Sequence, residues 1–290
     1  MPMKEAEYYD KLPEGVVSCT LCPHNCHIAR GKRGICKSRV NVDGVLCSEV
    51  YGHPCAVAID PIEKKPFRMF YPGSSCLSIA CTGCNLRCLN CQNFEISQVE
   101  PVKAERYDLS PADIVEMAQR EGQKIIAYTY TEPLTYLEYV RDTARLAHER
   151  GLKNVLVSAG YVNVKALNDL LPWLDAANID LKSFSDDIYR RVSGGSLRPV
   201  LDTILRMKDA GVWLEITHLL IPTVNDDAGM FRQMCGWLTA HHLASAPLHI
   251  SRFFPLYKMS HLYATPLSTM QRAERIAREE GIEHVFLGNV

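Results

Sequence analysis

The sequence contains no long hydrophobic run, no low-complexity segment and no excess of charge of either sign. A membrane-spanning helix needs about 18 or more consecutive apolar residues, and no stretch approaches that length, so we expect no membrane span. The 32 basic and 33 acidic residues nearly cancel, which removes the electrostatic argument for binding nucleic acid or an anionic membrane surface. The polar N-terminus lacks the apolar core of a secretory signal, and we expect a cytoplasmic protein.

The composition is that of a large globular chain with many cysteines. Of the 290 residues, 47% are hydrophobic and 22% are charged, which is enough for a sizeable core. The length fits one large α/β domain with a small appendage. There are twelve cysteines, and in a reducing compartment clustered cysteines are better explained as metal ligands than as disulfides.

Three cysteines follow one another with the spacing C-x3-C-x2-C, at Cys84, Cys88 and Cys91. Thiolates this close can hold one compact soft-metal centre. A cubic [4Fe–4S] cluster takes four cysteines, one per iron, so three leave one iron without a protein ligand. An open coordination position is what makes a metal site catalytic rather than structural. Structural zinc sites usually contain two separate C-x2-C pairs, and this run has no second pair. We therefore favour the cluster over a zinc knuckle.

This run closely resembles the signature of the radical S-adenosylmethionine (SAM) enzymes, including the residues Gly-Cys-Asn at its start and Gln-Asn at its end. In that family the amino nitrogen and the carboxylate of SAM chelate the open iron. The resemblance implies that an electron from the cluster cleaves SAM to methionine and a 5′-deoxyadenosyl radical. This radical then abstracts hydrogen from a substrate. We therefore expect an oxidoreductase with a [4Fe–4S] cluster and S-adenosyl-L-methionine as cofactors.

A second set of four cysteines lies near the N-terminus with the spacing C-x2-C-x3-C-x9-C, at Cys19, Cys22, Cys26 and Cys36. Four soft ligands are enough for a closed tetrahedral zinc site or for a second, fully ligated iron–sulfur cluster, and the sequence does not choose between them. A closed site would stabilise a segment too small to bury its own core. A hairpin that turns at residues 42–44 is expected to follow.

From about residue 75 the sequence alternates strand-like and helix-like segments, a pattern typical of βα units around a parallel sheet. The expected strands are 77–80, 125–128, 154–158, 177–181, 212–217 and 248–252. Six units predict an α/β fold of the TIM type, a partial (β/α)6 barrel whose ligands gather at the carboxyl ends of the strands. We expect a cysteine-rich subdomain with a hairpin at residues 1–72 and a core domain at residues 73–290.

Two residues after the expected strands resemble SAM contacts. Glu132, in the Thr-Glu-Pro run after the second strand, resembles the Gly-Gly-Glu-Pro element of radical SAM enzymes, which meets the SAM amino group. A carboxylate is a suitable partner for an ammonium; the alternative is a charge at the start of a helix. Ser158, after the third strand, matches part of a run that lies near SAM in related activating enzymes. A turn-forming serine is the structural alternative.

Two further strands carry candidate contacts. Alternation places Asp180 and Lys182 on one face of the fourth strand, where their burial costs several kcal/mol unless they pair with each other or with a ligand. Their Asp-x-Lys pattern resembles that of glycyl-radical activating enzymes, and SAM offers a charged partner to each. His249 on the sixth strand resembles a histidine that contacts the adenosine part of SAM, although a core histidine is an equal alternative.

The N-terminal cysteine set, the run at residues 60–66 and the central motif together are similar to one subgroup. It is the radical SAM member of the AmmeMemoRadiSam system, related to pyruvate formate-lyase activating enzyme. This resemblance implies AMMECR- and Memo-type proteins as partners and an electron donor such as flavodoxin or ferredoxin. It leaves open a glycyl-radical activase, a radical SAM enzyme with another substrate, and a non-catalytic iron–sulfur or zinc scaffold. No role follows from the sequence for Cys47, Cys55, Cys76, Cys81 and Cys235.

Overall fold

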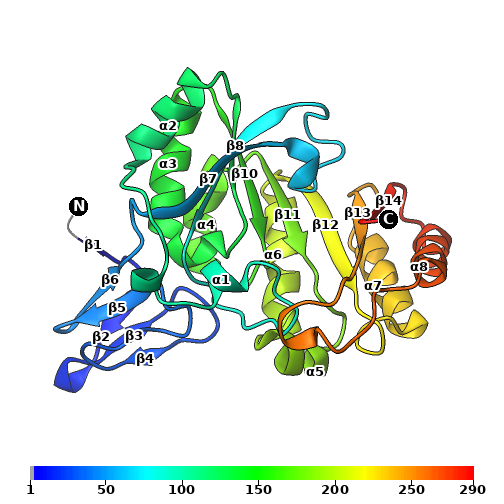
Figure 1. Cartoon of the computed structure of the whole chain (residues 1–290), viewed down its shortest axis with the longest axis horizontal. Helices are drawn as coiled ribbons and strands as arrows, with labels where there is room; N and C mark the ends of the chain where they lie inside the picture. The colour runs from blue at the N-terminus through cyan, green and yellow to red at the C-terminus, as the bar shows by residue number, and fades with distance from the viewer. Residues whose placement is uncertain (1–2) are drawn as a thin grey trace.

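Eight strands form the main sheet of the computed structural model, which describes residues 3–290 (Figure 1). In spatial order they are β14, β13, β12, β11, β10, β9, β8 and β7. Strands β8 to β14 run parallel, in sequence order, whereas β7 is antiparallel to β8. Their bounds are β7 Pro54–Pro61, β8 Ser75–Cys81, β9 Ile125–Tyr128, β10 Lys153–Ser158, β11 Ala176–Asp180, β12 Trp213–Leu220, β13 Leu248–Arg252 and β14 Val285–Gly288.

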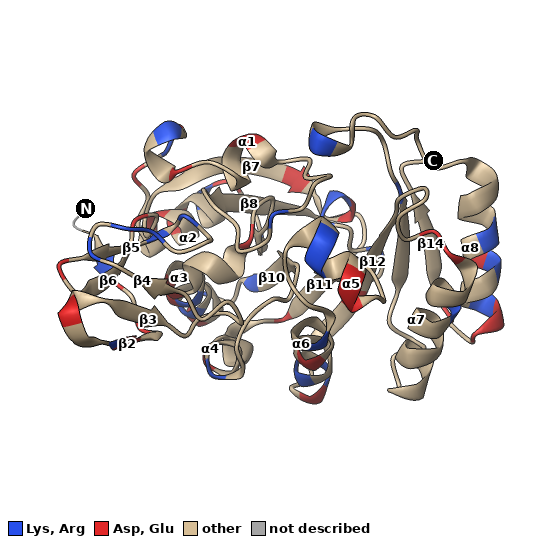
Figure 2. Ribbon diagram, turned by 90° about the horizontal axis from the view of Figure 1, so that it is seen from below, with Lys and Arg blue, Asp and Glu red and all other residues tan. Residues whose placement is uncertain are grey.

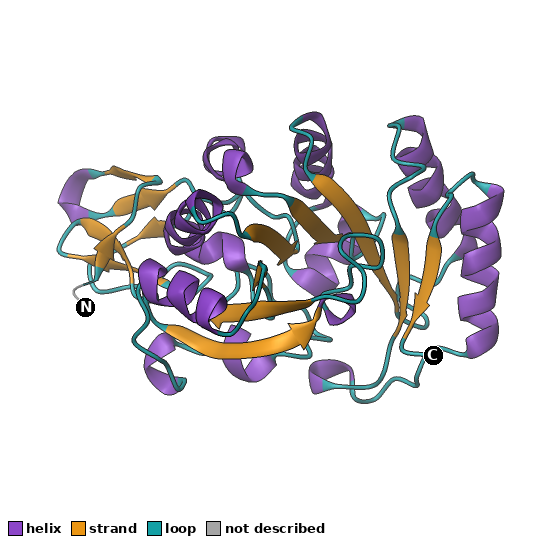
Figure 3. Cartoon of the chain, turned by 90° about the horizontal axis from the view of Figure 1, so that it is seen from above, coloured by secondary structure: helices purple, strands orange, loops and turns teal. Residues whose placement is uncertain are grey.

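The longer helices lie along one side of the curved sheet (Figure 3). They are α2 Pro111–Arg120, α3 Leu137–Glu149, α4 Val164–Leu170, α6 Leu197–Asp209, α7 Ala228–Ala240 and α8 Leu267–Glu279, with the shorter α1 Phe94–Ser97 and α5 Asp186–Ile188. Helix α2 begins with a local start signal, because Ser110 accepts the Asp113 backbone N–H and Pro111 occupies the first turn. Figure 2 shows charges of both signs along the outer helices α6 and α8.

Both faces of the parallel strands are covered, which explains their nearly continuous apolar runs. Alternate residues of β9, such as Ile126 and Tyr128, belong to the large core that includes the helices. The other residues of β9, Ile125 and Ala127, pack against a loop at residues 62–72 that supplies Ile62 and Phe67. This loop covers part of the inner face of the sheet, where it packs on residues of β9, β10 and β11.

The N-terminal residues form two small three-stranded sheets at the end of the molecule opposite α8 (Figure 1). One contains β1 Lys4–Glu5, β6 Val45–Ser48 and β5 Arg39–Val42, and the other contains β2 Tyr9–Lys11, β3 Val17–Cys19 and β4 His27–Ile28. Strands β5 and β6 form a hairpin through Asp43 and Gly44, whose φ angles of 50° and 86° are those of a tight hairpin turn. This confirms the predicted hairpin.

The α/β architecture with a mostly parallel sheet is the predicted one, and all six predicted strands are present. The sheet is larger than six βα units, because β14 adds a seventh parallel strand and β7 an antiparallel edge. Strand β7, at residues 54–61, lies before the predicted division at residue 72 but pairs with β8 along its length. The division at residue 72 stays a prediction. Within residues 3–290, no helix combines the length and apolar character needed to span a membrane.

Candidate functional site

A cavity of about 690 Å³ lies at the carboxyl ends of the parallel strands. Glu132 follows β9, Ser158 ends β10 and Asp180 ends β11, so the parallel pairing places them at the same edge of the sheet. The lining includes every residue predicted for the central site, namely Cys84, Cys88, Cys91, Glu132, Ser158, Asp180, Lys182 and His249. The fold therefore brings together side chains that span more than half of the sequence.

The cysteine loop follows β8 directly. Cys88 is buried, and Cys84 and Cys91 are partly exposed to the cavity. The Cys84 sulfur accepts a hydrogen bond from the Leu86 backbone N–H at 3.3 Å, and the Cys91 sulfur lies 3.1 Å from the Ser97 hydroxyl oxygen. Burial raises the pKa of the Cys84 thiol. Holding the Cys84 sulfur as a thiolate therefore requires a nearby positive charge, which a metal centre provides.

Kinds of metal centre differ in how thiol ligands surround them. Among residues 3–290, no three His, Cys, Asp or Glu side chains are grouped to hold a single ion. A zinc ion draws its ligands to about 2.3 Å from one point, whereas a cubic cluster assigns each cysteine to a different iron. Cys84, Cys88 and Cys91 line one cavity, and three cysteines are one fewer than the irons of such a cluster.

Glu132 is a buried carboxylate with three donors. Its Oε1 accepts hydrogen bonds from the Ser158 hydroxyl at 2.7 Å and the Leu134 N–H at 3.1 Å, and its Oε2 accepts the Ala159 N–H at 2.8 Å. Burial raises the pKa of Glu132, and these donors oppose the rise. An ionised carboxylate has about four acceptor positions, so one on Oε2 is left for a further donor. Ser158, predicted to lie near SAM, lines the cavity and donates its hydroxyl hydrogen to Glu132.

Asp180 and Lys182 share one face of the sheet edge, as alternation predicts. The Lys182 Nζ lies 2.8 Å from the Asp180 Oδ2. The side chains are 26% (Lys182) and 35% (Asp180) exposed, so both remain accessible from the cavity that they line. The pair presents one positive and one negative group beside the cysteine loop, which suits a ligand that carries both charges.

His249 lines the cavity from β13, and Glu215 of β12 lies directly behind it. The His249 Nε2 is 2.6 Å from the Glu215 Oε2, and the His249 ring stacks on Phe286 with centroids 5.5 Å apart. Glu215 also accepts the backbone N–H of Arg68 and Met69 at 2.9 and 3.0 Å. Burial opposes ionisation, but His249 and these N–H groups hold the pKa of Glu215 below its usual value.

Sequence reasoning missed Glu215, although its position within an otherwise apolar predicted strand was a usable signal. It also missed a cluster formed by Asp60, Lys65 and Tyr130. Lys65 is buried and lies 2.6 Å from the Asp60 Oδ2, and its Nζ lies 4.0 Å from the centre of the Tyr130 ring. Lys65 and Tyr130 line the cavity, so the run at residues 60–66 forms part of its wall.

The four N-terminal cysteines lie outside this cavity but close to the cysteine loop. Cys26 and Cys36 both approach Gly34, and Cys19, Cys22 and Cys36 are buried. The Cys36 carbonyl accepts the Cys84 backbone N–H at 3.2 Å, and a His24 ring nitrogen lies 2.8 Å from the Asn85 carbonyl. The two cysteine sets are thus neighbours.

Comparisons with known proteins agree with this geometry. The family model for the Radical SAM superfamily matches residues 78–234. An uncharacterized protein of Methanocaldococcus jannaschii, MJ0808, is 42% identical over 288 residues, which cover 99% of this chain and 86% of that protein. The pyruvate formate-lyase-activating enzyme of Clostridium pasteurianum is 25% identical over 155 residues, or 52% of this chain and 64% of that enzyme. The chain therefore spans less than two thirds of that enzyme.

A solved structure has the same fold. The radical SAM methyltransferase from Sphaerobacter thermophilus superposes with a TM-score of 0.57 at 16% identity, and the match covers 76% of this chain and 67% of that one. The match to the family model includes the three-cysteine loop and strands β9 to β12. Because this family model matches more than half of the chain and the architecture agrees with it, the chain belongs to the radical SAM superfamily.

Proposed function

We propose that this chain is an enzyme that uses SAM and a [4Fe–4S] cluster to abstract hydrogen from a substrate. When bound, the cluster supplies one electron that breaks a carbon–sulfur bond of SAM, which yields methionine and a 5′-deoxyadenosyl radical. The observation that carries the proposal is the shared cavity, where three cysteines without a fourth lie beside acidic and basic side chains.

Different residues of this chain would bind the cluster and the separate groups of SAM. Cys84, Cys88 and Cys91 would each hold one iron. The free acceptor position of Glu132 would take the ammonium of SAM, since a charged acceptor strengthens such a hydrogen bond. Lys182 and Asp180 would meet the carboxylate and the ammonium, and His249, held by Glu215, would face the adenosine. The protein's contribution is to orient both reactants and keep water from the radical.

A glycyl-radical activase is the second candidate, since similar proteins include enzymes named for activating pyruvate formate-lyase. In this case the substrate hydrogen would come from a backbone glycine of a partner enzyme. AMMECR- and Memo-type partners, an electron donor such as flavodoxin or ferredoxin, and a cytoplasmic location likewise stay proposals. The N-terminal cysteines would hold zinc or a second iron–sulfur cluster.

Spectroscopy on the reconstituted protein tests the proposal. The protein is loaded anaerobically with iron and sulfide, reduced, and examined by electron paramagnetic resonance before and after SAM is added. We expect SAM to change the signal of the reduced cluster in the wild type. We expect this SAM-sensitive signal to be absent when Cys84, Cys88 and Cys91 are replaced by alanine. A cluster signal that SAM leaves unchanged in the wild type would favour the non-catalytic scaffold and contradict the proposal.

A further inference from the structure

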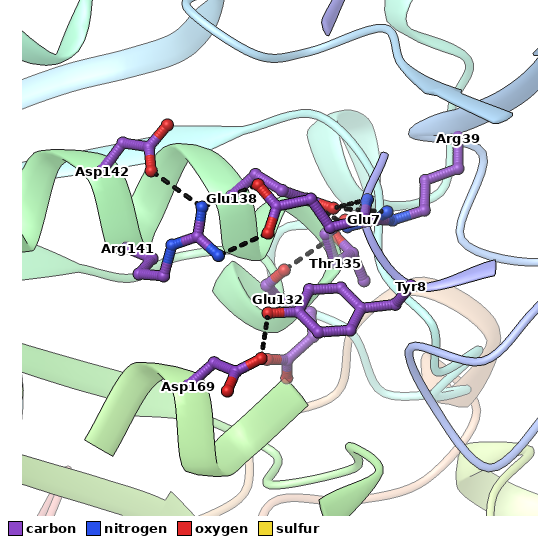
Figure 4. Close-up of polar contacts among 9 residues, drawn as sticks. All are labelled: Glu7, Tyr8, Arg39, Glu132, Thr135, Glu138, Arg141, Asp142 and Asp169. Carbon is purple, nitrogen blue, oxygen red and sulfur yellow. Dashed lines mark hydrogen bonds and ion pairs between the residues drawn. The ribbon is translucent and has the colours of Figure 1, made fainter. Parts of the chain in front are cut away.

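A buried arginine from the N-terminal sheets touches the turn that carries Glu132. Arg39 lies on β5, and its side chain has no exposed surface. The Arg39 Nη1 donates to the Glu138 Oε1 at 2.9 Å, and the Arg39 Nη2 donates to the other oxygen of the same carboxylate. The Arg39 Nε donates to the Thr135 carbonyl at 3.0 Å. Figure 4 shows this guanidinium between the hairpin and helix α3.

The ion pair between Arg39 and Glu138 holds helix α3 in a fixed position relative to the N-terminal sheets. Removing two charges from water is costly, and a buried ion pair is often no more stabilising than a well-packed apolar pair. The planar guanidinium of Arg39 has its donors at fixed angles, and here they engage Glu138 and Thr135 at once. The Glu138 carboxylate also accepts the Glu7 backbone N–H at 3.0 Å. The geometry therefore locks the start of α3 and the preceding turn against the N-terminal sheets.

Thr135 transmits this restraint to Glu132. The Thr135 backbone N–H and hydroxyl both donate to the Glu132 carbonyl, at 3.0 and 2.8 Å. Arg39 thus holds the carbonyl of Thr135, and Thr135 holds the backbone of Glu132. Arg39 is therefore linked through Thr135 alone to Glu132, which lines the cavity.

We propose that Arg39 is a positioning residue for the SAM amino group. It fixes the turn at residues 132–135, so that the unfilled acceptor position of Glu132 keeps its place in the cavity. The inference rests on the proposed function, because it takes Glu132 as the partner of that amino group. It gives the N-terminal segment a part in shaping the SAM site without contact with SAM.

A double substitution separates positioning from folding. Arg39→Met with Glu138→Leu removes both charges together, so that neither is left buried without a partner. Tyr8→Phe is the matched control. It removes the 3.1 Å hydrogen bond from the Tyr8 hydroxyl to Asp169, a contact of the same N-terminal segment that does not involve the 132–135 turn (Figure 4).

Three quantities are measured for each variant: the melting temperature, the amide hydrogen exchange of residues 132–137, and the Kd for SAM of the cluster-loaded protein. For the double variant we expect faster exchange at residues 132–137 and a Kd raised about tenfold or more, the usual effect of losing a group that orients a ligand-binding residue. For Tyr8→Phe we expect both quantities to match those of the wild type.

If the double variant does not fold, Arg39→Lys is measured in its place. It keeps a charge for Glu138 but lacks the fork that reaches Thr135, so it should weaken SAM binding while the protein stays folded. Unchanged exchange and an unchanged Kd in folded variants would overturn the proposal, even if melting were lowered. If the wild type binds no SAM, the proposed function fails, while exchange at residues 132–137 still decides whether Arg39 holds the turn.

Discussion

The chemistry of Glu132 depends on its neighbours. Burial raises the pKa of this carboxyl, while Ser158, Leu134 and Ala159 donate hydrogen bonds that favour its charged form. Such a residue is ready to receive a cation, because an ammonium would both fill the last acceptor position and offset the cost of burial. A resemblance in the Glu-Pro dipeptide pointed to Glu132, but only the folded structure identifies the three donors.

Glu132→Gln should weaken SAM binding and leave cluster assembly intact. The amide has nearly the same shape but no charge, and hydrogen bonds to charged groups contribute about 1.5–3 kcal/mol. This corresponds to a Kd raised roughly 10- to 150-fold. Glu63→Gln is the control, because Glu63 lines the same cavity while its carboxylate accepts the Gly73 N–H. Equal Kd values for the wild type and Glu132→Gln would exclude Glu132 as the partner of the amino group.

Gly83, next to Cys84, permits close contact between the two cysteine sets. Its φ is +108°, and an added Cβ would lie 2.4 Å from the Cys36 carbonyl oxygen. Gly73 has a φ of +79° and no atom within 4 Å of the same position. Gly73→Ala should therefore cost about 1–2 kcal/mol of unfolding free energy, because a Cβ disfavours this left-handed backbone conformation. Gly83→Ala should cost a further 1–3 kcal/mol, roughly, for the clash. Denaturant unfolding measures both, and equal losses would contradict the close approach.

At the scale of elements, the loop at residues 62–72 explains how an open sheet encloses a cavity. The loop packs its apolar side chains on the inner face of the sheet, and Glu215 holds its backbone from β12. The same carboxylate holds His249. One buried residue thus couples the loop, the sheet and a side chain of the cavity.

Glu215→Gln should reduce stability in a way that depends on pH. The pKa of Glu215 is lowered in the folded protein, so its contribution is fully present above the unfolded value of about 4.3 and is lost as the pH falls through the folded value. The wild type should therefore exceed the variant by roughly 1–3 kcal/mol near neutral pH, and the difference should shrink below about pH 4.3. Urea unfolding across this range tests it, and a constant difference would contradict the assigned charge.

Local patterns predicted the elements better than their long-range contacts. The strand at 125–128 and the start of α2 at Ser110 follow from apolar runs and capping residues close in sequence. The pairing of β7 with β8 does not follow from such local patterns, because a loop separates the two strands in sequence. The attachment of Arg68 to Glu215 joins residues 147 positions apart, and no local pattern contains such a contact.

At the scale of the whole molecule, the N-terminal sheets lie against the part of the core that holds the site. They reach the cysteine loop through Cys36 and His24, and the turn of Glu132 through Arg39. The cavity residues were predicted because each lies on or just after a recognisable strand and resembles part of a radical SAM motif. Arg39 and Lys65 were not, because they reach the site from segments distant in sequence.

Replacing Cys19, Cys22, Cys26 and Cys36 by alanine should remove a second metal centre and lower the stability of residues 1–72. Elemental analysis of the purified protein measures the loss of metal, and proteolysis followed by mass spectrometry locates the loosened region. The matched variant is the triple alanine replacement of Cys84, Cys88 and Cys91, which should lose a different centre. Metal content and protease resistance equal to the wild type would remove the N-terminal site from the account.

The formation of 5′-deoxyadenosine tests the central claim most directly. The protein is reconstituted anaerobically with iron and sulfide, reduced with dithionite and given SAM, and the product is quantified by chromatography. We predict that the wild type forms 5′-deoxyadenosine and that the protein with Cys84, Cys88 and Cys91 replaced by alanine does not. Equal product from both proteins would contradict the assignment of the site, and no product from a wild type with an assembled cluster and bound SAM would contradict the proposed chemistry.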